Sequence, residues 1–167
     1  MTPNPFAVLQ AKQRAWLIAL LTAVVEAYEL GAVLGPGAVI HANGEVLTPD
    51  VVYLSDAERA HTKADAVYCP VPLAIDVLHS RVPEAERAER RARYAAAHVL
   101  EYWQVDADRG RAAFYQADAN WHYDLIPPDA KGVYHSAAIV PLALPVIWLR
   151  RQPRLLTMLE WWGLVEK

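Results

Sequence analysis

The sequence predicts an α/β fold in which α-helices flank a central mixed β-sheet. A long apolar pattern with helical spacing opens the chain, and a near-continuous apolar run at Leu73–Leu78 is typical of a central strand. The charged helical segment Pro83–Ala97 follows that strand directly. The chain has 167 residues, of which 54% are hydrophobic and 21% are charged, so we expect residues 1–167 to form a single domain with a sizeable core.

The first helix is predicted to start near Asn4-Pro5, where a capping residue precedes a proline, and to stop at Gly31. Within it, Ala15–Val25 is apolar apart from Thr22, which resembles the hydrophobic part of a secretory signal. Apolar residues nevertheless recur at helical spacing throughout, and the run is shorter than the roughly 20 residues that span a bilayer. We therefore expect a helix packed within the domain and no membrane association.

Short extended segments are predicted after the first helix. They are an extended pair around Val33 and Val39, turn chemistry at His41–Gly44, and a strand at Val51. The segment Ser55–Cys69 is polar and mixed in composition, so we expect a surface excursion that holds one helical turn.

The second half of the chain continues the alternation of strands and helices. A strand is expected at Val99–Val105, and the segments Arg111–Gln116 and Trp121–Ile126 flank Asp118-Ala119-Asn120, a pattern typical of a hairpin. Loop with further short strands follows, and Arg154–Trp162 is predicted to be a closing amphipathic helix.

Charge and cysteine content limit the classes of function. The 16 basic and 19 acidic residues give a net charge of −3, so the chain lacks the overall basic character of a tight DNA binder, although a local basic patch is compatible with this balance. The single cysteine, Cys69, cannot form an internal disulfide, and no Cys/His spacing of the zinc type occurs. A reducing cytoplasmic compartment is the simplest expectation.

Two aspartates on successive predicted strands are the chemical feature that stands out. An ionised aspartate in an apolar strand is costly to bury unless a partner compensates its charge, and Asp76 lies in the predicted central strand. With Asp50 at the start of the preceding strand, the pair indicates a shared cation such as Mg²⁺ or Mn²⁺. Asp50 also follows Pro49, and a turn role is the alternative for Asp50 taken alone.

Four segments, in order, resemble the Uma-type putative restriction endonuclease family of the PD-(D/E)XK nuclease superfamily. They are Pro49–Val52, Ile75–Leu78, Tyr94 four residues after a basic position, and Val99–Asp106. The resemblance runs from about the first helix to Leu149. It implies a restriction-endonuclease-like fold, divalent-metal-dependent hydrolysis of DNA, and a shortened N-terminus, because family members usually carry a hairpin before the first helix.

The resemblance also assigns roles to individual residues. Asp50 matches the family's first acidic position, and Asp76 matches its second, which is normally a glutamate. Arg90 matches the superfamily lysine, which in this family lies in the helix after the strand. His79 stands at a serine position, and Gln10 stands where a histidine is often found. Asp50, Asp76 and Arg90 are therefore the catalytic candidates, and the two aspartates are the candidate metal ligands.

These departures predict a degenerate active site. Aspartate keeps the charge of glutamate but shortens the arm, and Mg²⁺ demands near-ideal octahedral geometry, which Mn²⁺ demands less strictly. Arginine keeps the charge of lysine but never deprotonates in practice. Arg90 also lies four residues after Glu86, so an ordinary helix ion pair is the alternative for Arg90 alone. His79 and Glu86 are accessory candidates.

The sequence thus predicts a weak metal-dependent endonuclease with DNA as its candidate substrate. The alternative is a catalytically impaired nuclease-fold protein that acts as a binding or assembly module. Surplus aromatic residues in the C-terminal segment, among them Trp148, Trp161 and Trp162, predict a homodimer because large exposed aromatic patches mark interfaces.

Overall fold

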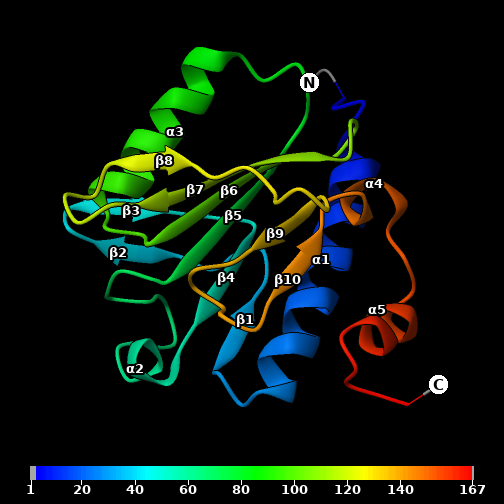
Figure 1. The fold of residues 1–167 in the computed structure, drawn as a ribbon. Coiled ribbons are helices and arrows are strands. Elements are labelled where there is room, and N and C mark those ends of the chain that lie inside the picture. The colour runs from blue at the N-terminus through cyan, green and yellow to red at the C-terminus, as the bar shows by residue number, and fades with distance from the viewer. Residues whose placement is uncertain (1–2, 167) are drawn as a thin grey trace.

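The computed structural model describes residues 3–166 and forms a six-stranded mixed sheet with helices on both faces (Figure 1). The elements are α1 (Ala7–Ala27), β1 (Ala32–Leu34), β2 (Ile40–Ala42), β3 (Glu45–Leu47), β4 (Val51–Leu54), α2 (Asp56–Arg59), β5 (Leu73–Leu78), α3 (Glu84–Ala96), β6 (Glu101–Asp106), β7 (Arg111–Ala117), β8 (Tyr123–Leu125), β9 (Val133–His135), β10 (Ala143–Pro145), α4 (Trp148–Arg151) and α5 (Leu155–Trp161). The predicted α/β class is confirmed.

The strand order of the main sheet is β1-β4-β5-β6-β7-β8. Strands β5 and β6 are parallel and are joined through α3, whereas the other neighbours pair antiparallel. A parallel pair requires a crossover of this kind, because its second strand must restart at the same end of the sheet. The crossover packs α3 against β3 and β6, from where Arg90 and Tyr94 reach Asp76 on β5.

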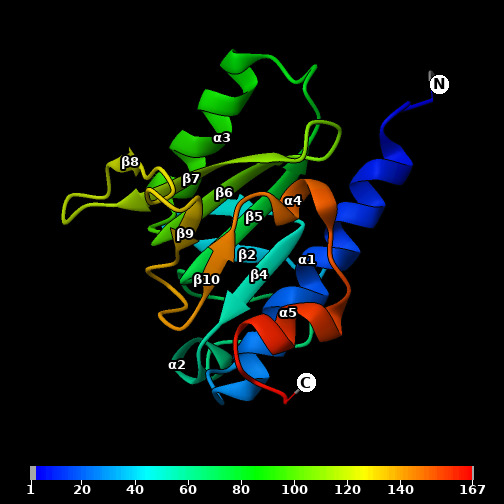
Figure 2. The same ribbon diagram turned by 45° about the vertical axis from the view of Figure 1, so that its right-hand side comes forward.

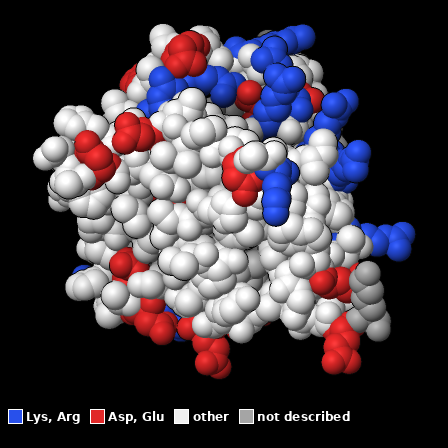
Figure 3. Space-filling view, viewed as in Figure 1, with Lys and Arg blue, Asp and Glu red and all other residues white. Residues whose placement is uncertain are grey.

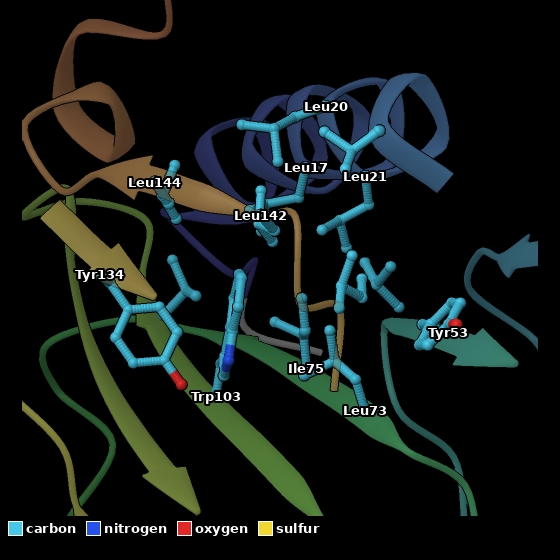
Figure 4. Close-up of a cluster of buried hydrophobic side chains, with 14 of the residues drawn as sticks. Leu17, Leu20, Leu21, Tyr53, Leu73, Ile75, Trp103, Tyr134, Leu142 and Leu144 are labelled. Carbon is cyan, nitrogen blue, oxygen red and sulfur yellow. The ribbon is translucent and has the colours of Figure 1, made fainter. Parts of the chain in front are cut away.

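Two apolar clusters lie on opposite faces of the sheet. On one face, side chains of α1 such as Leu17 and Leu20 pack on Ile75 and Trp103, and all four are fully buried (Figure 4). On the other face, the cluster under α3 includes Ala74, Val52 and Tyr102. Alternate residues of β5 therefore serve opposite clusters, as the two-residue period of a strand requires. By the same alternation, Asp76 lies on the α3 side.

Helix α1 contains the apolar run Ala15–Val25, which resembles the hydrophobic part of a secretory signal. By length and composition alone it could cross a membrane. In the fold its apolar face is buried against β1, β4, β5 and α5, so the expectation of a packed helix is confirmed (Figure 2). It starts three residues after Asn4 and ends four residues before Gly31, because the flanking residues form turns.

One predicted pairing is wrong. The segments around Val33 and Val39 do not pair with each other: Val33, in β1, pairs with Tyr53 of β4 at the sheet edge. The segment after Val39 forms a hairpin of its own, β2 with β3, which turns at Asn43-Gly44, where both residues have positive φ. Such Asn-Gly turns match the twist of a two-residue hairpin, so local turn chemistry prevailed over pairing with β1.

The C-terminal part is attached to the sheet through a buried carboxylate. Glu101 on β6 is fully buried and accepts hydrogen bonds from Trp103 Nε1, the Tyr134 hydroxyl and the Ser136 hydroxyl. It also accepts the backbone N–H groups of residues 137 and 138. Five donors compensate the buried charge, so the β9–β10 hairpin is held in one position.

Candidate functional site

All five predicted site residues line one cavity of about 400 Å³, which we call the site cleft. They are Asp50, Asp76, His79, Glu86 and Arg90. The cleft lies where the start of β4, the end of β5, the start of α3 and the first turns of α1 meet, and Gln10 of α1 lines it as well. Gln10 and Arg90, which are 80 residues apart in the sequence, thus lie at the same end of the sheet.

Asp50 continues the β4–β5 pairing with its side chain. Val51 pairs with Ile75, so the next step of this antiparallel register places Asp50 beside Asp76. The Asp50 backbone N–H donates to Ile75 O at 2.9 Å, and its Oδ2 accepts the Val77 N–H at 2.7 Å. Its Oδ1 accepts from Arg14 Nε at 2.5 Å. Asp50 therefore has a structural role at the strand start and still lines the cleft.

Asp76 is only 3% exposed and accepts three side-chain donors. The Tyr94 hydroxyl donates to its Oδ1 at 2.9 Å, and its Oδ2 accepts the Tyr102 hydroxyl at 2.8 Å and Arg90 Nη1 at 3.2 Å. Burial raises the pKa of Asp76 above its ordinary value, although these three donors act in the opposite direction. Burial, and then the negative charge of Asp76, raise the pKa of Tyr94 and Tyr102, so both remain hydroxyl donors.

Arg90 bridges the two acidic side chains beside it. Besides its contact with Asp76, it donates through Nε and Nη2 to Glu86 Oε1 at 3.2 and 2.9 Å. Arg90 therefore forms both the helix ion pair with Glu86 and the contact with Asp76. Burial favours the neutral guanidine, but the hydrogen bonds and charges of Glu86 and Asp76 outweigh it, and the pKa of Arg90 is raised. Its side chain is 40% exposed and is accessible from the cleft.

His79 and Gln10 close the end of β5 toward α1. The His79 ring stacks on Phe6 with the centroids 4.6 Å apart, and its buried Nδ1 has no hydrogen-bond partner within residues 3–166. Gln10 donates to Val77 O at 2.8 Å and accepts from Asn4 Nδ2 at 2.7 Å. His79 thus lines the cleft without a hydrogen bond to either aspartate.

Sequence reasoning missed Arg14 and the hydroxyl role of Tyr102. Arg14 lies four residues after Gln10 on α1, so both reach the cleft from one helix face, and this spacing was the only available signal. Tyr102 is fully buried among apolar side chains, and its hydroxyl also donates to Asp76. Only the fold reveals that each aspartate faces its own arginine.

The two carboxylates of the site cleft retain lone pairs that no hydrogen bond uses. Within the described part of the chain there is no cluster of three or more His, Cys, Asp or Glu side chains suited to a metal. A carboxylate offers about four lone-pair sites, of which Asp50 uses two and Asp76 three. Mg²⁺ commonly takes one or two carboxylates and keeps several waters, which this pair can provide in competition with Arg14 and Arg90.

Comparisons with known proteins identify the family and the fold of this chain. The model of a family described as Uma2, putative restriction endonuclease, matches residues 1–150. The crystal structure of a putative nuclease belonging to DUF820 from Anabaena variabilis is similar with a TM-score of 0.68 and 10% sequence identity. The similarity covers 91% of this chain and 83% of that chain, and at this identity it shows the fold. No curated protein matches.

Proposed function

Because this chain belongs to the Uma2 family, described as putative restriction endonucleases, we propose that it is a divalent-metal-dependent endonuclease of low activity that hydrolyses phosphodiester bonds of DNA. One observation carries the proposal. Asp50, just before β4, Asp76 on β5 and Arg90 on α3 line the same cleft. Two carboxylates and a cation at one end of a mixed sheet are the groups that metal-assisted hydrolysis needs.

The two aspartates would hold Mg²⁺ or Mn²⁺. A bound ion of this kind supplies an activated water and offsets charge on the phosphate. The residues around the aspartates position them: the Tyr94 and Tyr102 hydroxyls fix the Asp76 carboxylate, and the Val77 N–H fixes that of Asp50. A carboxylate held by such donors needs little further ordering when a ligand arrives.

Arg90 would bind a phosphate oxygen. Its planar guanidinium suits bidentate contact with phosphate, and Glu86 orients it from the preceding helical turn. Because its pKa is raised, it stays protonated throughout and takes no proton from an attacking water. Arg90 therefore contributes charge and orientation but no acid–base step.

The same contacts account for low activity. Arg14 already pairs with Asp50 and Arg90 with Asp76, so a divalent ion must compete with two guanidinium groups. Asp76 is also one methylene shorter than the glutamate usual at this position, and it is nearly inaccessible. Both features lower metal affinity, and we expect nicking that depends on Mn²⁺ rather than efficient cleavage with Mg²⁺.

Nicking of supercoiled plasmid and cleavage of single-stranded DNA test this proposal. We compare the wild type with Asp50→Asn, Arg90→Lys and the double variant Asp76→Glu with Arg90→Lys, and use Asp56→Asn, an exposed aspartate on α2, as the matched control. Asp50→Asn should abolish cleavage, and the double variant should raise it by about tenfold to a thousandfold. A gain of activity is more informative than a loss, because a contaminating nuclease can imitate a weak wild type.

The arginine partners favour one alternative, a nuclease fold that acts as a binding or assembly module. If Arg14 and Arg90 permanently replace the metal, Mn²⁺ will leave the melting temperature unchanged, and the double variant will stay inert although folded. If the site binds metal, the melting temperature rises with Mn²⁺ concentration, because a ligand that binds only the native state stabilises it. Asp50→Asn should remove that rise.

A further inference from the structure

A second basic cavity lies beside α4, away from the residues of the proposed catalytic step. It measures about 480 Å³, and its charged lining includes Arg109, Arg111 and Arg150, which we call the basic subsite. All three side chains belong to exposed residues, and none forms a salt bridge with any residue between 3 and 166. Three unpaired cations gathered around one cavity repel each other, and an anion would relieve that repulsion.

The backbone brings these arginines together. Gly110 lies between Arg109 and Arg111 in the β6–β7 turn with a φ of +58°, and a Cβ at this position would lie 2.6 Å from the Arg150 Cα. The turn therefore touches the backbone of α4 at a distance that only glycine allows. This close packing is an ordered feature of the fold, so the three guanidinium groups share one rigid base.

One acidic residue, Asp108, also lines the cavity, but its carboxylate is already engaged. The Ser80 backbone N–H donates to Asp108 Oδ1 at 2.9 Å, and the Ser80 hydroxyl donates to Oδ2. Asp108 thus fixes the loop after β5 and keeps its negative charge, which attracts Arg109, but one carboxylate among three guanidinium groups leaves the lining with an excess of positive charge. The balance of the cavity remains positive.

Further basic residues line the cavities next to the basic subsite and the site cleft itself. Lys12 lines a smaller cavity of about 200 Å³ that shares Arg150 with the basic subsite. Lys12 lies on α1 between Gln10 and Arg14, which line the site cleft, and Arg81 lines that cleft too. Figure 3 shows most Lys and Arg side chains at the top and upper right, where α3, the first turns of α1 and α4 lie, with some Asp and Glu among them, and mainly Asp and Glu along the lower edge.

We infer that Arg109, Arg111 and Arg150 form a binding subsite for backbone phosphates of DNA that extends from the site cleft across the first turns of α1. A polymer with a phosphate on every nucleotide can contact both cavities at once, whereas a single small anion fills only one. This local patch resolves the apparent conflict between a net charge of −3 and a nucleic-acid substrate. The inference rests on the proposed function for the choice of DNA as the polymer.

The test measures binding of a fluorescent DNA duplex by anisotropy, with EDTA present so that no cleavage occurs. The triple variant Arg109→Ala, Arg111→Ala, Arg150→Ala should bind more weakly, and the slope of log K against log salt should fall by about 3, since each lost phosphate contact removes about 0.9. The matched control, Arg59→Ala, Lys63→Ala, Lys131→Ala, loses the same charge at exposed positions outside these cavities and should retain the wild-type slope. Replacement of the three arginines by lysine should restore most of the binding.

Three results would overturn the inference: equal binding by the triple variant and the wild type, equal losses in the triple variant and the control, or no DNA binding by the wild type. Binding of the wild type to anionic phospholipid vesicles without binding to DNA would assign the patch to a membrane surface instead. Failure of the proposed catalytic function can be distinguished from failure of this inference, because cleavage and DNA binding are measured separately. If every variant is inert as a nuclease but the basic subsite still governs DNA binding, the catalytic proposal is wrong and the subsite stands.

Discussion

The charge state of Asp76 is set by two opposing effects. Burial removes water from the carboxylate and favours the neutral acid, whereas Tyr94, Tyr102 and Arg90 favour the anion. Burial prevails, and the pKa of Asp76 is raised above its ordinary value. A raised pKa at a residue that lines the site cleft is the kind of perturbation that accompanies functional sites, although buried networks produce it too.

The raised pKa predicts how stability depends on pH. Between the ordinary aspartate pKa of about 3.9 and the higher folded pKa, the native state binds more protons than the unfolded state, so stability falls as the pH rises through this window. Asp76→Asn removes the titrating group. The free energy of unfolding of this variant, relative to wild type, should therefore increase as the pH rises from about 4 to 7.

Urea denaturation at a series of pH values measures this difference. Asp124→Asn, at an exposed position on β8, is the matched control and should show a flat difference over the same range. A difference for Asp76→Asn that is flat, or that decreases with pH, would contradict the assignment of burial as the dominant effect.

At the scale of elements, the unit β5–α3–β6 builds the candidate site. Asp76 lies on β5, Arg90 and Tyr94 lie one turn apart on α3, and Tyr102 lies on β6. The parallel pairing places Asp76 beside Gln104, whose Nε2 donates to the Tyr102 hydroxyl at 3.3 Å. One crossover therefore holds the carboxylate, its cation and both hydroxyl donors in a single rigid arrangement.

Contact between the β6–β7 turn and α4 gives a prediction at this scale. Gly110→Ala adds a Cβ where the Arg150 backbone leaves no room, and it also imposes a positive φ on an alanine. Gly44→Ala imposes positive φ in the β2–β3 hairpin with nothing within 4 Å of the new Cβ. Gly44→Ala should cost about 1–2 kcal/mol, and Gly110→Ala should cost about 1–3 kcal/mol more.

Chemical denaturation of both variants checks this. If Gly110→Ala is no less stable than Gly44→Ala, the turn and α4 are not in close contact. Because the basic subsite depends on that contact, Gly110→Ala should also weaken DNA binding more than Gly44→Ala does.

At the scale of the whole molecule, the C-terminal segment leaves an apolar surface. Trp148, Trp161 and Trp162 pack edge to face with ring centroids 5.2–6.4 Å apart, and Trp162 Nε1 donates to Ala143 O. Part of the aromatic surplus is therefore buried within the chain. Trp161 remains 50% exposed, and Leu156, also on α5, is 59% exposed.

Because these apolar side chains on α5 are exposed, we predict that the protein is a homodimer. Light scattering at micromolar concentration should give twice the mass of the 18.6 kDa chain, and Leu156→Glu with Trp161→Glu should give the monomer. Val140→Glu, at an 83% exposed position outside α5, is the control and should leave the mass unchanged. A monomeric wild type would show that the α5 surface is not a self-association interface.

Local pattern was sufficient for much of the fold and for the main candidates of the site. The apolar run of β5 with its isolated aspartate, the charged helix that follows it, and the turn at Asn43-Gly44 are all properties of neighbouring residues, and each appears where the sequence indicates. An aspartate in a central strand needs partners, and that requirement alone singled out Asp76. The pattern also paired Asp50 with it, and the family resemblance favoured a site role over a turn role for Asp50 and added Arg90; the structure places both in the same cleft as Asp76.

Contacts between distant segments were decided only by the tertiary structure. The pairing of Arg14 with Asp50, the Tyr102 hydroxyl on Asp76, the pairing of β1 with β4, and the gathering of Arg109, Arg111 and Arg150 depend on how helices and strands pack. Periodicity reports which face of an element is apolar, but it does not report which element covers that face. The sequence therefore determined which buried polar side chains need partners for their charge or hydrogen bonds, and tertiary packing decided which residues are those partners.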